Sequence, residues 1–166
     1  MPRATVRAAI SQYLSSSNIS FLGTVFPHPP KVTAEGEFEI GKFPGKGTGA
    51  VIYVYLEDQS EQRVREIGLA PGGKMRTYKV RLICFLRSVK PKAEDVDADN
   101  DTFLDSLVLA IQQNRAPGTG AIFQWGEGDT VGAVDIEIKA GLPSTIRLQL
   151  TQVFTTVEVL AIEMNT

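Results

Sequence analysis

TIRLQLTQVFTTVEVLAIE, residues 145–163, is the stretch of sequence that decides the fold. Successive side chains of an extended strand point to opposite sides of a sheet, so apolar residues at every second position mark a buried side. The pattern changes phase at 151–152. The apolar residues before the change share one side: Ile146, Leu148 and Leu150. Those after it share the other: Val153, Val157, Val159 and Ala161. One small subunit cannot bury both sides in turn, so we expect a long C-terminal strand region over 144–166 that bends at a bulge or pairs with a neighbouring subunit.

Length and charge limit the classes of protein. A chain of 166 residues suits a single domain over 1–166. The 17 Lys and Arg against 19 Asp and Glu give a formal net charge of -2, whereas a dedicated nucleic-acid-binding protein is expected to be strongly basic. No apolar run is long enough to span a bilayer, so we expect a soluble protein made in the cytoplasm.

The cysteine and the histidine of this chain, residue types that often act in catalysis or bind metals, give no sign of either role. Cys84 is the only cysteine, so no intrachain disulfide can form, and its apolar surroundings in 80–86 predict a buried, inert thiol. His28 is the only histidine, and the sequence contains no Gly-x-Ser-x-Gly elbow to accompany it. We therefore predict no catalytic residue, no metal site and no cofactor.

Two short motifs resemble ligand-binding loops without their key residues. Residues 36–42 spell most of a phosphate-binding loop, but Phe43 stands where a Ser or Thr would reach magnesium. Asp95-x-Asp97-x-Asp99 resembles the start of a calcium loop, but Asn100 replaces the required glycine and Ser106 the bidentate glutamate. We interpret the acidic stretch 94–101 as a solvated linker that caps the following helix, although a weak, adventitious cation site there stays open.

Helical periodicity occurs twice. Residues 5–15 carry one apolar stripe, formed by Val6, Ile10, Tyr13 and Leu14. A second helix, Thr102–Gln113, carries another, formed by Phe103, Leu104, Leu107, Val108 and Ile111. Its expected cap is Asp99, Asn100 or Asp101.

Alternating or continuous apolar runs predict strands over 19–25, 50–56, 63–67, 75–89, 121–125 and 131–139, the last two as an antiparallel hairpin. Residues 31–49, rich in Gly, Lys, Glu and Pro, predict a long mobile loop. Phe123 and Trp125 are expected in the core rather than as a base-stacking platform. The fold class is therefore α+β: a mostly antiparallel twisted sheet with two helices packed on one face, plus a long extended loop.

The strand over 75–89 has basic residues beside its apolar side: Arg76, Lys79, Arg81 and Arg87. They form either a solvated edge, where such residues discourage random pairing, or a face that meets acidic residues of a neighbouring subunit. We predict the first for any single residue and the second for the face as a whole. The candidate oligomer interface comprises Arg76, Lys79, Arg81, Asp135, Glu137 and Arg147.

The layout resembles the tail terminator, or tail-completion, proteins of long-tailed bacteriophages and the related minor tail and neck proteins. The likeness lies in the order of four features: the opening helix 6–14, the long strand 74–89 after a glycine turn, the helix 102–113 with its Asp-rich start, and the closing strands 131–162. It covers most of the chain and is a likeness of pattern, without a short diagnostic motif.

The resemblance implies a structural virion protein of the phage tail, assembled in the host cytoplasm. Such proteins are similar in forming a hexameric ring that caps the tail tube and joins it to the head connector, while DNA passes through the lumen without specific binding. Two alternatives stay open. One is a head-completion, neck or tail-tube subunit of the same virion, and the other is a small-molecule-binding α+β domain or enzyme.

Overall fold

The computed structural model describes residues 3–32, 38–39, 48–63, 74–90, 92–113, 123–126, 134–147 and 150–163. The elements follow one another as α1 (Arg3–Ser16), β1 (Leu22–Phe26), β2 (Lys31–Val32), β3 (Phe38–Glu39), β4 (Gly49–Arg63), β5 (Lys74–Ser88), α2 (Ala93–Gln113), β6 (Phe123–Trp125), β7 (Ile136–Ala140), β8 (Ser144–Arg147) and β9 (Leu150–Glu163).

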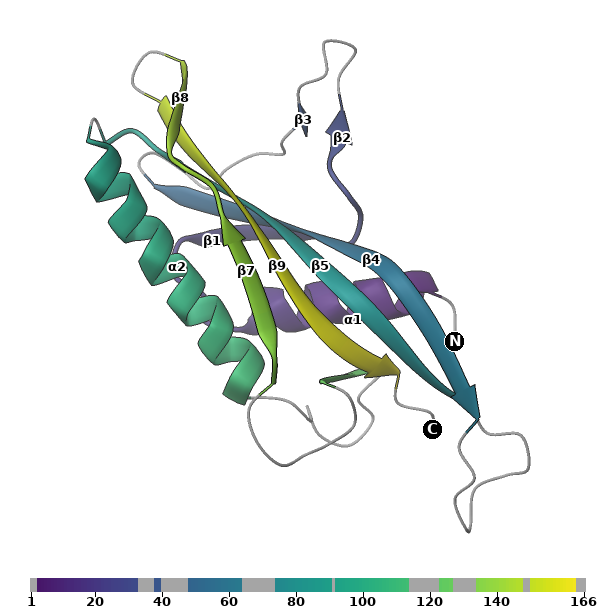
Figure 1. Ribbon diagram of the computed structural model, residues 1–166. Coiled ribbons are helices and arrows are strands. Elements are labelled where there is room, and N and C mark those ends of the chain that lie inside the picture. The colour runs from purple at the N-terminus through teal and green to yellow at the C-terminus, as the bar shows by residue number, and fades with distance from the viewer. Residues whose placement is uncertain are drawn as a thin grey trace.

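Seven strands form one curled sheet (Figure 1). Strands β1, β4, β5 and β9 lie side by side in that order. The three short strands β6, β7 and β8 all pair with the other edge of β9. In the described part of the sheet only β1 and β4 are parallel, and the remaining pairs are antiparallel. The separate pair β2–β3 is antiparallel as well. The predicted α+β class with a mostly antiparallel sheet is confirmed.

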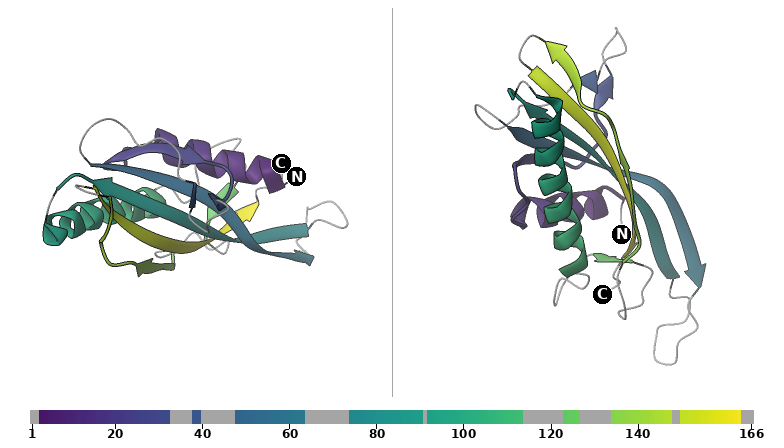
Figure 2. Two further views of the ribbon diagram at one scale, coloured as in Figure 1. Left: turned by 90° about the horizontal axis from the view of Figure 1, so that it is seen from above. Right: turned by 60° about the vertical axis from the view of Figure 1, so that its left-hand side comes forward.

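Both helices pack on the same face of this sheet, which we call the helix face. Figure 2 shows the sheet curling around them, with α1 nearest β1 and β4, and α2 nearest β5 and β9. Val6, Ile10 and Leu14 of α1 are fully buried, as the stripe predicts. Every second residue of β5 from Tyr78 to Leu86 is also buried on this face. Burying one such side chain stabilises the fold by roughly 1.5–3 kcal/mol, so this face holds the main core.

The expected single strand over 144–166 is wrong, because β8 and β9 are separate strands that pair with each other antiparallel. The chain reverses direction between them, and the pairing also contains a register irregularity between Thr145 and Arg147. In β9 the predicted apolar residues do face the core: Val153, Val157, Val159 and Ala161 are all buried.

The second helix begins earlier than predicted. It starts at Ala93, so the stretch 94–101 forms its first turns, and Asp99, Asn100 and Asp101 lie inside the helix instead of capping it. Val96 and Asn100 are buried, two turns and one turn before Phe103 respectively, and they extend the buried stripe towards the start of the helix. A calcium loop over 95–106 is excluded by this helical backbone.

The expected hairpin between 121–125 and 131–139 is also wrong, because β6 and β7 each pair with β9 and not with each other. The predicted strand over 50–56 is longer than expected, and its partner over 75–89 is confirmed as β5. Three predictions lie outside the described residues: the strand residues 64–67, the turn at 71–73 and most of the loop over 31–49.

Candidate functional site: an assembly surface

The face of the sheet opposite the helices, which we call the opposite face, carries a row of aromatic rings across four strands. Phe26 of β1 stacks on Tyr53 of β4, with ring centroids 4.9 Å apart. Tyr53 meets Phe85 of β5 edge-on at 6.1 Å, and Phe85 lies 5.1 Å from Phe154 of β9. Tyr53 and Phe85 are buried, whereas Phe154 is 38% exposed. This aromatic row ties the strands together on the opposite face, where neither helix packs.

Next to the aromatic row lies a charged network of four side chains: Glu57, Lys79, Arg81 and Glu158. The guanidinium of Arg81 donates hydrogen bonds from Nη2 to Glu57 at 2.8 Å and to Glu158 at 2.9 Å. The ammonium of Lys79 lies 3.5 Å from Glu158 and 3.7 Å from Glu57. Two cations and two carboxylates thus neutralise one another across β4, β5 and β9.

A β-bulge places one member of this network. The register of β4 against β5 shifts between Leu56 and Asp58, so Glu57 has no residue directly opposite it. A bulge adds one residue to a strand and re-aims the side chains around it. The Glu57 carboxylate therefore reaches Arg81, which is paired across the ladder with Tyr55.

The network shifts the pKa values of Glu158 and Lys79. Glu158 is largely buried, which alone would raise its pKa, but the hydrogen bond from Arg81 and the positive charges of Lys79 and Arg81 outweigh burial, so the pKa is lowered. The carboxylates of Glu158 and Glu57 raise the pKa of Lys79. Each charged form is stabilised by its partners, as expected of a structural ion pair.

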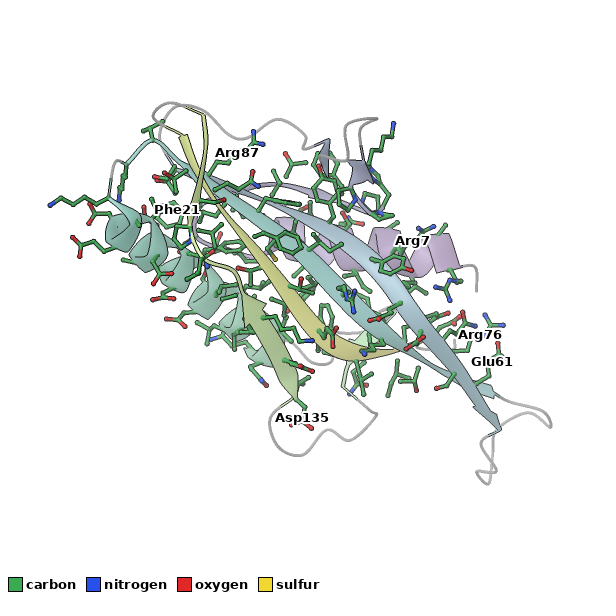
Figure 3. All side chains as sticks on the ribbon, turned by 45° about the horizontal axis from the view of Figure 1, so that its top comes forward. Arg7, Phe21, Glu61, Arg76, Arg87 and Asp135 are labelled. Carbon is green, nitrogen blue, oxygen red and sulfur yellow. The ribbon has the colours of Figure 1, made fainter. Side chains whose placement is uncertain are left out.

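The basic residues predicted to form an interface lie in the middle of the sheet. Strand β5 is flanked by β4 and β9, so the interpretation of its basic residues as a sheet edge is wrong. Lys79 and Arg81 have partners within the chain, and Arg76 lies 2.8 Å from Glu61 and 3.6 Å from Glu163 (Figure 3).

Asp135 and Glu137 come from the segment just before β7 and from β7 itself, and the structure brings them near Lys79. Together with Glu158 these residues line a shallow pocket of about 280 Å³. Figure 3 shows Asp135 at the start of β7, far from Arg87 at the opposite end of the sheet. Within one chain Lys79, Asp135 and Glu137 thus line the same pocket, and whether the basic residues of β5 meet these acidic residues between subunits stays a prediction.

The remaining candidates have simpler positions. Arg147 ends β8, where its backbone pairs with Leu150. Phe123 and Trp125 are buried on the helix face, as predicted, with their rings 5.0 Å apart. Cys84 is buried, and burial raises the pKa of its thiol, which agrees with the predicted inert residue.

Two edges of the sheet are open in the described part of the chain. Strand β1 pairs with β4 only as far as Tyr53, and no described strand covers the same edge from Val54 to Arg63. Strand β7 pairs with β9 on one side, and no described strand covers its other side. Open edges present unpaired backbone groups to which another strand can bind. The sequence analysis did not predict which segments form these open edges, because the sequence of one strand does not reveal which strands lie beside it.

No close group of three or more His, Cys, Asp or Glu side chains that could hold a metal ion occurs among the described residues. Within the same ranges no helix is long and apolar enough to cross a membrane. No family model and no curated protein matches the chain.

Proposed function

We propose that this protein is a non-enzymatic structural subunit that closes head to tail into a ring, as the tail terminator proteins of long-tailed bacteriophages do. In this role a ring, expected to be a hexamer, caps the finished tail tube and joins it to the head connector in the virion. The observation that carries the proposal is the pair of open sheet edges on β4 and β7, which lie on opposite sides of the subunit.

A closed ring needs two different, complementary surfaces on each subunit, because each copy contacts its two neighbours through different surfaces. The two open edges supply two such surfaces. The β4 edge belongs to the long β4–β5 ribbon that continues past the end of β9, and Figure 1 shows it projecting from the body of the molecule. The β7 edge is exposed at four of its five residues.

The charges are compatible with this role. Lys79 and Arg81 are already neutralised by Glu57 and Glu158, so they give the subunit no free basic surface. A net charge of -2 also suits a lumen that lets DNA pass without holding it. The partners in this proposal are other copies of the chain, the tail tube protein and the head connector protein.

The test is the assembly state of the purified protein. Light scattering coupled to size exclusion, measured over a wide range of concentrations, should show a single closed oligomer, and negative-stain microscopy should show rings. A protein that stays monomeric at every concentration, without rings, would contradict the proposal.

A second experiment separates the roles within a virion. Immobilised protein is offered tail tube and head connector proteins, and a tail terminator should retain both. Retention of the tube protein alone would favour a tube subunit, and retention of the connector alone a neck subunit. Thermal stabilisation by a metabolite, with neither protein retained, would favour the small-molecule alternative.

A further inference from the structure

The two open edges differ in the chain segments that they offer. On β4, residues 58–61 after the bulge are exposed. Just before the bulge, Arg3 of α1 donates a hydrogen bond to the Leu56 carbonyl oxygen at 2.7 Å. On β7, the exposed residues run from Glu137 to Ala140.

Strand direction makes these two edges compatible. Strands β4, β5, β9 and β7 are successively antiparallel, so β7 runs opposite to β4 within one subunit. If the copies are related by rotation about an axis roughly parallel to the strands, β4 runs in the same direction in every copy, and so does β7. The opposite face of the sheet then also lies on the same side of the ring in every copy. The β7 strand of one copy therefore meets the β4 edge of the next copy as an antiparallel partner, which is a hydrogen-bonding geometry that sheets use.

The faces of the two strands also match. On the opposite face, Asp58 and Ser60 of β4 lie across from Lys79 and Thr77, and Glu137 and Lys139 of β7 lie across from Glu158 and Thr156. A ring keeps these four residues on one face of the combined sheet, where the charge of Lys139 complements that of Asp58. Gln59 points to the helix face, where its side-chain oxygen accepts a hydrogen bond from Arg3 at 2.8 Å.

We propose that β7 (Ile136–Ala140) of one copy adds as an antiparallel strand to the open edge of β4 after the bulge (Asp58–Arg63) in the next copy. The occupant of the β4 edge is thus a second copy of this chain. The inference rests on the proposed function, since it names the contact through which the ring closes.

Disulfide trapping tests this contact directly. Within one chain β4 and β7 are separated by β5 and β9, so three strand spacings put them roughly 14 Å apart. Disulfide-bonded residues have Cα atoms less than about 7 Å apart, so any bond between introduced cysteines on β4 and β7 must join two copies. The native Cys84 is buried and does not compete.

The variants combine Ser60→Cys with either Glu137→Cys or Lys139→Cys, because all three positions face the same side. After mild oxidation of the full chain, a non-reducing gel should show a ladder of covalent multimers for at least one pair. The matched control moves the first cysteine by one residue: Gln59→Cys with the same β7 cysteine faces the other side and should give a several-fold weaker ladder.

Three results would overturn the inference. They are no ladder with either Ser60 pair, an equal ladder with the Gln59 control, or an equal ladder when Ser60→Cys is combined with Leu109→Cys on the exposed side of α2. Single-cysteine variants, checked for native circular dichroism, define the background. Rings of the wild-type protein without a Ser60 ladder would refute this contact alone, whereas the absence of both would refute the proposed function as well.

Discussion

The two faces of the sheet are stabilised in different ways. The helix face is covered by α1 and α2 and buries a continuous apolar core that includes Phe103, Leu107 and Trp125. The opposite face holds its strands together with the aromatic row and the charged network, whose outer members are partly exposed to solvent. One face therefore specifies the fold of the chain, while the other keeps the long strands aligned without a covering layer.

The largest difference between the faces should appear when one phenylalanine is removed from each. Phe103→Ala leaves a cavity in the core and should lower the free energy of unfolding by about 3–5 kcal/mol. Phe154→Ala, at a position that is 38% exposed, should cost about 1 kcal/mol. Urea unfolding measures both losses, provided that the free energy of unfolding depends on urea concentration with the same slope in all variants. Equal losses would show that the opposite face is buried as completely as the core.

Adding a single methyl group at Gly141, between β7 and β8, should lower the stability of the protein. A Cβ on Gly141 would lie 2.5 Å from the carbonyl oxygen of Phe154, which also accepts a hydrogen bond from the Gly141 amide. Gly141→Ala should therefore destabilise the protein by about 1–3 kcal/mol, since a backbone atom must move. The neighbouring Leu142→Ala, at an 89% exposed position, is the control and should change stability by less than about 0.5 kcal/mol.

The charged network should contribute less than the core. Arg81→Ala removes the hydrogen bonds to Glu57 and Glu158, and because the Arg81 side chain is 34% exposed we expect a loss of about 1 kcal/mol. The matched control is Lys139→Ala, which removes an ion pair with both side chains more than half exposed and should cost almost nothing. A double-mutant cycle of Arg81→Ala with Glu158→Gln measures their coupling, and purely additive effects would contradict the network.

The smallest effect is the dependence on pH. The pKa of Glu158 is lower in the folded protein than in the unfolded chain. The contribution of its carboxylate to stability is therefore complete above the unfolded pKa of about 4.3, and it is lost as the pH falls through the lower pKa of the folded protein. Between about pH 5 and about pH 3 the wild type should thus lose more stability than Glu158→Gln. Urea titrations at the two pH values measure these losses. Equal losses in the wild type and in Glu158→Gln would show that Glu158 does not cause the dependence of stability on pH.

The period of apolar residues was sufficient to predict the helix face. Val6, Ile10 and Leu14 of α1 and the alternate residues of β5 are buried as expected, since a side chain's direction follows from its position in a helix or strand. The start of α2 was missed because Asp and Asn are typical caps. The spacing of Val96, Asn100 and Phe103, at intervals of four and three, was the signal that placed them on one side of a longer helix.

The opposite face was less predictable for a physical reason. Residues that alternate along one strand reveal its sides, but contacts such as Arg81 with Glu158 depend on which strands are neighbours and in what register. The phase change at 151–152 was expected to mark a bulge or pairing with a neighbouring subunit, and the reversal of the chain between β8 and β9 became visible only from their antiparallel pairing. The acidic partners of Arg76, Lys79 and Arg81 are Glu57, Glu61, Glu158 and Glu163 of the same chain, none of which was among the predicted residues.

Strand β9 comes after every other element in the chain, yet it alone joins β5 to β6, β7 and β8. A ribosome must therefore synthesise residues 150–163 before the sheet can close, and until then β5 exposes an apolar side and an unpaired edge. Nascent chains in that state are prone to aggregate. Subunits are expected to become competent for association only after β9 has paired with β5, which would delay closure of the proposed ring until that step.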